Sequence, residues 1–171
     1  MSVDKLNQRS NNFSCVLNVP NGIDDLLNKE VIYKFFTTSG YTLTYIAIAN
    51  HNLDTDDYGN KKTLHYHVVL SFDENMRIGT LINYISEGLY LPKNCISVEK
   101  CGSIVMQTRY LIHLDDIDKY QYDVGIIKTN DINFVHRCMK YIKTINSIDD
   151  LIAICKGYRN PIELNILFAL Q

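Results

Sequence analysis

Two histidines, His65 and His67, stand two positions apart in the stretch Thr63 to Phe72. That stretch is rich in β-branched and aromatic residues, which is typical of a strand. Because successive side chains of a strand point to opposite faces, both imidazoles would lie on one face and Tyr66 on the other. Two imidazoles at this spacing can bind one metal ion, although histidines that are satisfied by hydrogen bonds alone are common.

His51 and Asp54 favour the metal interpretation. A strand is predicted over Tyr41 to Ala49, it should pair with the histidine strand, and His51 follows shortly after it. A third imidazole and a carboxylate would then lie close to the other two histidines. Such ligands bind Mn²⁺, Zn²⁺, Co²⁺ or Ni²⁺ more tightly than Mg²⁺, whereas abundance in a cell favours Mg²⁺. The acidic residues at 56 and 57 are interpreted as a solvated turn.

A candidate nucleophile, Tyr110, lies on a helix predicted from Gly102 to about His113. The chain has twelve tyrosines, and a tyrosine on a helix more often packs than reacts. An ordinary phenol is only about one part in a thousand ionised at neutral pH. A nucleophilic tyrosine would therefore need an electrophile activated by a metal ion, or a base nearby.

The elements that must position these residues alternate in the order β-α-β-β-α-β-α. Strands are predicted over 13–19, 41–49, 63–72 and 95–99, and helices over 23–38, 75–89 and 103–113. The two strands at 41–49 and 63–72 are predicted to form a hairpin with a long loop. This order predicts an α+β fold, an antiparallel sheet backed by helices. After about residue 128 the pattern is helical, with helices predicted over 131–145, after Ser147 and from Pro161.

The composition of the chain excludes several classes of protein. With 171 residues, 46% hydrophobic and 21% charged, the chain should form one globular domain, or one such domain with a small helical appendage. A net charge of -2 argues against a protein that coats DNA by bulk electrostatics. Five cysteines without a CxxC pair indicate a reducing compartment rather than a zinc cluster. No apolar run is long enough for a membrane span and no signal peptide is visible, so we expect a cytoplasmic protein.

Four segments in order carry a resemblance to a known family. They are His51-x-x-Asp54, His65-Tyr66-His67-Val68, Tyr110-Leu111-Ile112-His113 and Lys119-x-x-Tyr122. Together they resemble the replication initiators of small rolling-circle plasmids of Gram-positive bacteria, which are HUH endonucleases with a single catalytic tyrosine. One departure is Ile112, where that family usually has threonine. The resemblance covers residues 13–128 and implies an HUH endonuclease domain of RRM-like fold. The polar stretch 1–12 is predicted to be a flexible N-terminus, and 129–171 is predicted to be a helical C-terminal segment.

The resemblance implies a mechanism and assigns roles to residues. His65, His67, His51 and Asp54 would hold one divalent cation, Mn²⁺ or Mg²⁺, which polarises a phosphate of single-stranded DNA. Tyr110 would attack in line, leaving a 5′-phosphotyrosine and a 3′-OH that primes replication. The expected partners are single-stranded or hairpin origin DNA and the helicase and polymerase of a bacterial host.

Other contacts are expected from charge and from the helical segment. Candidates for phosphate contact are Lys61, Lys62, Arg77, Lys100 and Arg109, for which solvated surface charge is an equal alternative. Tyr120 and Tyr122 are interpreted as structural or as DNA contacts. The C-terminal helices are predicted to mediate self-association into a homo-oligomer.

Three other functions fit the same residues. The chain could be another HUH enzyme, a relaxase or a transposase, although relaxases usually carry the tyrosine near the N-terminus. It could be a DNA-binding regulator on the same fold, with the helical segment as a helix-turn-helix module, or a metal-binding structural protein. Formation of a covalent adduct with DNA separates the enzymes from the last two.

Overall fold

A five-stranded antiparallel sheet with helices on its two faces forms the fold, and the predicted α+β class is confirmed. The computed structural model describes residues 3–20, 22, 26–38, 40–56, 58–116 and 118–140. The strand order is β4-β1-β3-β2-β5. The elements are α1 (Val3–Asn7), β1 (Arg9–Asn18), α2 (Lys29–Thr37), β2 (Leu43–His51), β3 (His65–Arg77), α3 (Ile78–Leu89), η1 (Lys93–Cys95), β4 (Ile96–Lys100), α4 (Ile104–Tyr110), η2 (Val124–Ile126), β5 (Lys128–Thr129) and α5 (Ile132–Lys140).

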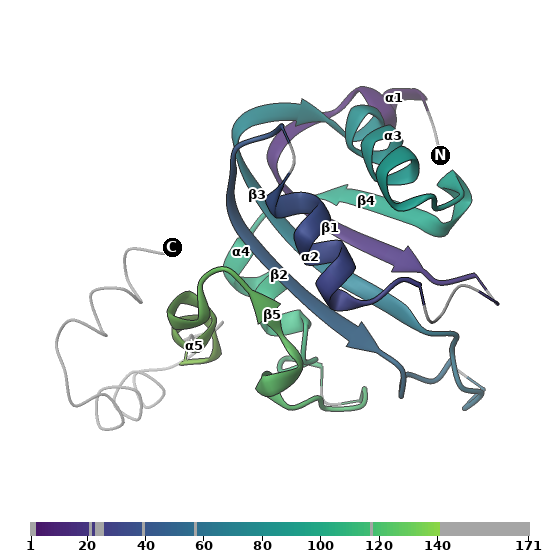
Figure 1. Cartoon of the computed structure of the whole chain (residues 1–171). Coiled ribbons are helices and arrows are strands. Elements are labelled where there is room, and N and C mark those ends of the chain that lie inside the picture. Colours follow the sequence, from purple (N-terminus) through teal and green to yellow (C-terminus); the bar gives the residue numbers. More distant parts are fainter. Residues whose placement is uncertain are drawn as a thin grey trace, which may run out of the picture.

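One face of the sheet, which we term the covered face, lies under α2 and α3 (Figure 1). Alternate residues of the strands, such as Leu17, Val68 and Leu70, are fully buried there. They pack in one cluster with Ile32 and Phe36 of α2 and with the apolar stripe of α3. The apolar residues that alternate along each strand thus pack against the apolar stripes of α2 and α3, and together they form the main hydrophobic core.

The opposite face, which we term the histidine face, carries a smaller apolar cluster. Ala47 and Val69 of the sheet pack there against Leu111, Ile112 and Val135. The end of this face beyond the cluster bears His65 and His67.

The hairpin of β2 and β3 was predicted, and it sets the register of the site. His51 lies opposite His65, and Ala49 opposite His67, in an antiparallel pair. Residues that face each other across two strands share one side of the sheet. The pairing therefore brings three imidazoles to the same end of the histidine face.

Several element boundaries differ from those predicted. A helix, α1, and the first residues of β1 occupy part of the stretch 1–12 that was predicted to be flexible. Backbone pairing of β1 with the far end of β3, across a bulge, extends the strand through polar residues. β3 runs on to Arg77, where a helix was predicted from residue 75. α2 begins only at Lys29, because the Asn28 side chain caps it.

The end of the chain is described only in part. α5 (Ile132–Lys140) lies within the helix predicted over 131–145, and the two helices predicted after Ser147 and from Pro161 fall outside the described residues. β5 was not predicted, since two residues carry no periodic pattern. No helix in the described part of the chain is long and apolar enough to cross a membrane.

Candidate active site

Three histidines of the hairpin lie in contact at one end of the histidine face. The ring centroids of His51 and His67 are 4.4 Å apart, and those of His51 and His65 are 5.5 Å apart. All three residues are buried. One ring nitrogen from each lies within 4.8 Å of the other two, close enough for a shared metal ion. The structure thus brings together the histidines that the sequence singled out.

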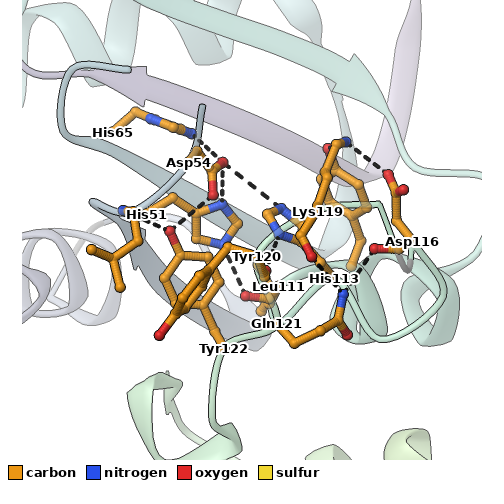
Figure 2. Close-up of polar contacts among 12 residues, drawn as sticks. His51, Asp54, His65, Leu111, His113, Asp116, Lys119, Tyr120, Gln121 and Tyr122 are labelled. Carbon is orange, nitrogen blue, oxygen red and sulfur yellow. Dashed lines mark hydrogen bonds and ion pairs between the residues drawn. The ribbon is translucent and has the colours of Figure 1, made fainter. Parts of the chain in front are cut away.

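Asp54 projects from the loop after β2 into this group (Figure 2). Its Oδ2 atom lies 3.3 Å from Nδ1 of His51 and 3.4 Å from Nε2 of His65. The same oxygen is 3.9 Å from Nε2 of His113, a histidine beyond the end of α4. The other oxygen, Oδ1, accepts a hydrogen bond of 2.9 Å from the Tyr122 hydroxyl. One carboxylate oxygen therefore faces three imidazoles, and a tyrosine orients that carboxylate.

In the three imidazoles that face Asp54, backbone carbonyls determine which ring nitrogen carries the proton. Nε2 of His51, Nδ1 of His65 and Nδ1 of His113 each lie within 2.9 Å of a carbonyl oxygen, which can only accept; the oxygens belong to Leu111, Thr63 and Tyr120. In each neutral ring the other nitrogen then has a lone pair, and that nitrogen faces Asp54. Lone pairs opposite a carboxylate repel it unless a cation lies between them.

His113 gives a second test of whether a metal ion fits. The residue is fully buried, and its Nε2 is the one buried side-chain nitrogen or oxygen without a hydrogen-bond partner in the described part of the chain. Its ligand atom lies within 4.8 Å of those of His51 and Asp54. An unpaired buried acceptor is costly. The ligand set of imidazole nitrogens and one carboxylate thus fits a divalent transition metal ion.

The electrostatics hold the ligands in the forms that bind a metal ion. Burial, together with the neighbouring histidines, lowers the pKa of His67 to about 2. Burial likewise lowers the pKa of His51. Burial raises the pKa of Asp54, but the Tyr122 hydrogen bond and the nearby histidines outweigh it, so that the pKa lies below its ordinary value. Neutral imidazoles and an ionised carboxylate are the states that coordination requires.

Tyr110 is the last residue of α4, a short helix that the Ser103 side chain caps. Its ring packs against His67 and His113, with centroid distances of 5.5 and 5.1 Å. The Tyr110 oxygen accepts a hydrogen bond of 2.8 Å from Nζ of Lys119. The candidate nucleophile therefore lies beside the candidate metal ligands.

An open cleft of about 490 Å³ gives access to the site. His65, His67, Asp54 and Tyr110 line it, whereas His51 and His113 are fully buried. Lys62, a predicted DNA contact, also lines this cleft. A strand of nucleic acid could thus reach the metal ligands and the tyrosine from one side.

The other predicted DNA contacts are dispersed. Lys61 and Lys100 are exposed and do not line the cleft. Arg77, at the far end of β3, lines a separate cleft of about 400 Å³ together with Arg9. The roles of Lys61, Lys100 and Arg77 as DNA contacts remain predictions.

The prediction for Arg109 is wrong, since its guanidinium is buried and paired within the protein. Its Nε and Nη2 atoms donate to the Asp115 carboxylate at 2.8 and 2.6 Å. Nη1 donates to the carbonyls of Cys138 and Met139 at the end of α5. Arg109 ties α4 to α5 and is not available for a phosphate. Its partners lie too far along the chain to be visible as a helical i,i+4 pair.

The sequence analysis assigned no role to His113 or Lys119, and its structural or DNA-contacting interpretation of Tyr122 did not include the hydrogen bond to Asp54. All three follow α4, in a segment with no regular pattern of apolar residues. Their only signal was membership of the segments Tyr110-Leu111-Ile112-His113 and Lys119-x-x-Tyr122 that carried the resemblance. The backbone of His113 has a φ of +57°, rare for a residue other than glycine, and this turn returns its ring to the site.

Comparison with known proteins supports one part of the resemblance, namely a role in plasmid replication. The profile of a family described as "Plasmid replication protein, origin binding domain" matches residues 5–137. The replication protein RepB of Lactiplantibacillus plantarum is 35% identical over 79 residues, which is 46% of this chain and 34% of that protein. A replication protein of Staphylococcus aureus is 30% identical over 80 residues, 47% of this chain and 38% of that protein. The matched regions thus span little more than a third of these relatives.

Proposed function

We propose that this chain, which belongs to the family of plasmid replication protein origin-binding domains, nicks and rejoins single-stranded origin DNA through Tyr110. The observation that carries the proposal is the position of the Tyr110 ring, 5.5 Å from that of His67 in a cleft lined by metal-ligand side chains. A tyrosine and a metal ion that share one phosphate suffice for strand transfer.

The metal ligands in this proposal are His65, His67, Asp54 and Nδ1 of His51, and the Nε2 atom of His113 lies beside the set, 3.9 Å from the same Asp54 oxygen. A divalent cation, Mn²⁺ or Mg²⁺, would supply Lewis acidity to the scissile phosphate there. The carbonyls behind His51 and His65 hold the rings with the ligand nitrogen turned inward. Tyr122 holds the carboxylate in the same way.

The proposed reaction exchanges one phosphate ester for another. The Tyr110 oxygen forms a bond to phosphorus, and the bond from phosphorus to the 3′ oxygen breaks. The phenol loses its proton to solvent, and the 3′ oxygen gains a proton from solvent to become the 3′-OH. The number of phosphodiester bonds is unchanged, so the joined strand can be re-formed without ATP. The free 3′-OH can prime a polymerase, which is what rolling-circle replication needs.

The partners of the whole protein follow from this role. Origin DNA would approach along the cleft, where Lys62 contacts a phosphate. Host helicase and polymerase would act on the exposed strands in a bacterial cytoplasm. The segment 129–171 would mediate self-association, and of this segment residues 141–171 lie outside the described part of the chain.

Covalent trapping tests the proposal. Labelled single-stranded oligonucleotides that tile the replicon carrying the gene are incubated with the protein and Mn²⁺, then separated under denaturing conditions. We expect a labelled band at the mass of protein plus DNA. Tyr110→Phe should abolish the band, whereas Tyr120→Phe, a change at a half-exposed ring, should preserve it. Absence of an adduct from the wild type would refute the proposed nicking activity. An adduct with Tyr110→Phe would refute the assignment of Tyr110 as the nucleophile.

A second function, origin binding without cleavage, is favoured by the family description, which names only binding. The protein would then retain one origin duplex specifically in a mobility-shift assay and form no adduct. The same oligonucleotides, annealed to their complements, distinguish the two functions.

A further inference from the structure

Lys119 contacts the oxygen of the candidate nucleophile. Its Nζ donates to the Tyr110 oxygen at 2.8 Å and lies 4.7 Å from the centre of the same ring. Nζ also pairs with the Asp116 carboxylate at 2.9 Å, which fixes the ammonium group over the tyrosine. In the described part of the chain, no other side chain has a hydrogen bond to the Tyr110 oxygen.

An ammonium group at this position acts on the oxygen in two ways. Because Nζ donates, the phenolic hydrogen must point elsewhere, and the lone pairs of the oxygen are oriented by that bond. As the oxygen loses its proton and attacks, negative charge on it is stabilised by the adjacent positive charge. Lys119 side-chain atoms are 39% exposed, so solvent weakens this effect without removing it.

Lys62 provides the contrast within the same cleft. Both lysines line it, but no hydrogen bond of the described residues joins Lys62 to Tyr110. Two cations in one cleft therefore differ in what they touch: Lys119 touches the reacting oxygen, and Lys62 faces the space that DNA would fill.

We propose that Lys119 is a catalytic residue of the strand transfer proposed above, and that it acts on the tyrosine oxygen rather than on the 3′ oxygen. While the bond from the Tyr110 oxygen to phosphorus forms and the bond to the 3′ oxygen breaks, Lys119 keeps its proton and donates a hydrogen bond to the attacking oxygen. On rejoining, the same contact stabilises the departing phenolate. In-line transfer holds the attacking and leaving oxygens on opposite sides of phosphorus, which separates Lys119 from the 3′ oxygen.

The inference rests on the proposed function, and the test separates the two. Single-turnover rates of adduct formation are measured at saturating Mn²⁺ with an oligonucleotide that the wild type cleaves, and with the same oligonucleotide bearing a bridging 3′ sulfur at the scissile phosphate. Lys119→Met should lower the rate on the order of 10²-fold on both substrates. Lys119→Arg should recover most of the rate, since it restores a charged donor. Lys62→Met should raise the DNA concentration for half-maximal rate more than it lowers the maximal rate.

Three outcomes would overturn the role of Lys119. The first is a Lys119→Met rate within threefold of the wild type. The second is a sulfur substrate that restores Lys119→Met to the wild-type rate, because a good leaving group would then replace what the lysine supplies at the 3′ oxygen. The third is loss of Mn²⁺ affinity or of thermal stability in Lys119→Met, which would make the lysine structural. If the wild type itself forms no adduct, the proposed function fails instead.

Discussion

The two faces of the sheet are built in opposite ways. In the described residues, the cluster of the covered face contains apolar side chains together with Cys15 and Tyr66. The histidine face buries four histidines and a carboxylate beside a smaller apolar cluster. One face gains stability from removing apolar surface from water. The histidine face instead buries imidazole nitrogens whose lone pairs point at the Asp54 carboxylate.

This difference separates the source of stability from the source of function. Because the two apolar clusters are separate, we expect a change in the covered face to leave the ligand atoms in place and a change in the histidine face to leave the main core intact. Natural active sites commonly carry such locally unfavourable arrangements, offset by the rest of the fold.

Phe36→Ala should have the largest effect, confined to stability. The side chain is fully buried in the covered-face cluster, and its removal leaves a cavity. We expect a loss of about 3–5 kcal/mol in the free energy of unfolding, measured by urea denaturation. Under conditions where the variant is folded, its Mn²⁺ affinity by calorimetry should equal that of the wild type.

Val31→Ala is the matched control for that prediction. It lies on the same helix with 41% of its surface exposed, and should change the unfolding free energy by less than about 1 kcal/mol. A fall in the Mn²⁺ affinity of folded Phe36→Ala would contradict the independence of the two faces.

Tyr122→Phe should have the next largest effect, and chiefly on the metal site. The variant removes the hydroxyl that donates to Oδ1 of Asp54 and accepts from the Leu53 amide. Groups that orient a metal ligand typically contribute about 10–100-fold in affinity. Calorimetric titration with Mn²⁺ should show a loss in this range. Tyr120→Phe is the control, and an equal loss in both variants would exclude an orienting role for Tyr122.

The covered face and the hairpin histidines follow from periodicity. Alternation in β3 puts Val68 and Leu70 on one face and His65 and His67 on the other, and antiparallel pairing then places His51 opposite His65. The alternation and the hairpin were predicted from the sequence, and they were enough to place His51 close to the two histidines, whereas its register opposite His65 was not predicted. The α+β class needed no more than the order of such elements.

The segment after α4 could not be predicted in the same way. The positions of His113 and Lys119 depend on a turn with a positive φ and on how far a long side chain reaches, neither of which has a periodic signature. Arg109 was misassigned because charge alone does not distinguish a surface cation from one buried against Asp115. Tertiary hydrogen bonds, invisible to pattern, decide the roles of these residues.

The smallest expected effect is a dependence of stability on pH that arises from the histidine face alone. Burial lowers the pKa of His67 to about 2, so the folded, metal-free protein keeps this ring neutral at a pH where the unfolded chain binds a proton. The stability that depends on the neutral ring is present above the unfolded pKa of about 6.5 and is lost progressively as pH falls below it. Between pH 8 and pH 5.5 the free energy of unfolding should therefore fall by about 1.4 kcal/mol from this residue. His51, whose pKa burial also lowers, adds to the fall.

Two variants assign that dependence to one face. His67→Gln cannot titrate, so its unfolding free energy, measured by urea denaturation of the metal-free protein at each pH, should fall less steeply than that of the wild type. Phe36→Ala removes no titrating group, and its curve should lie below that of the wild type but parallel to it. If the slope of Phe36→Ala were flattened as much as that of His67→Gln, the acid sensitivity would belong to the whole fold. Parallel curves for all three proteins would show that protonation of His67 does not oppose folding, because the folded chain would then accommodate the charged ring.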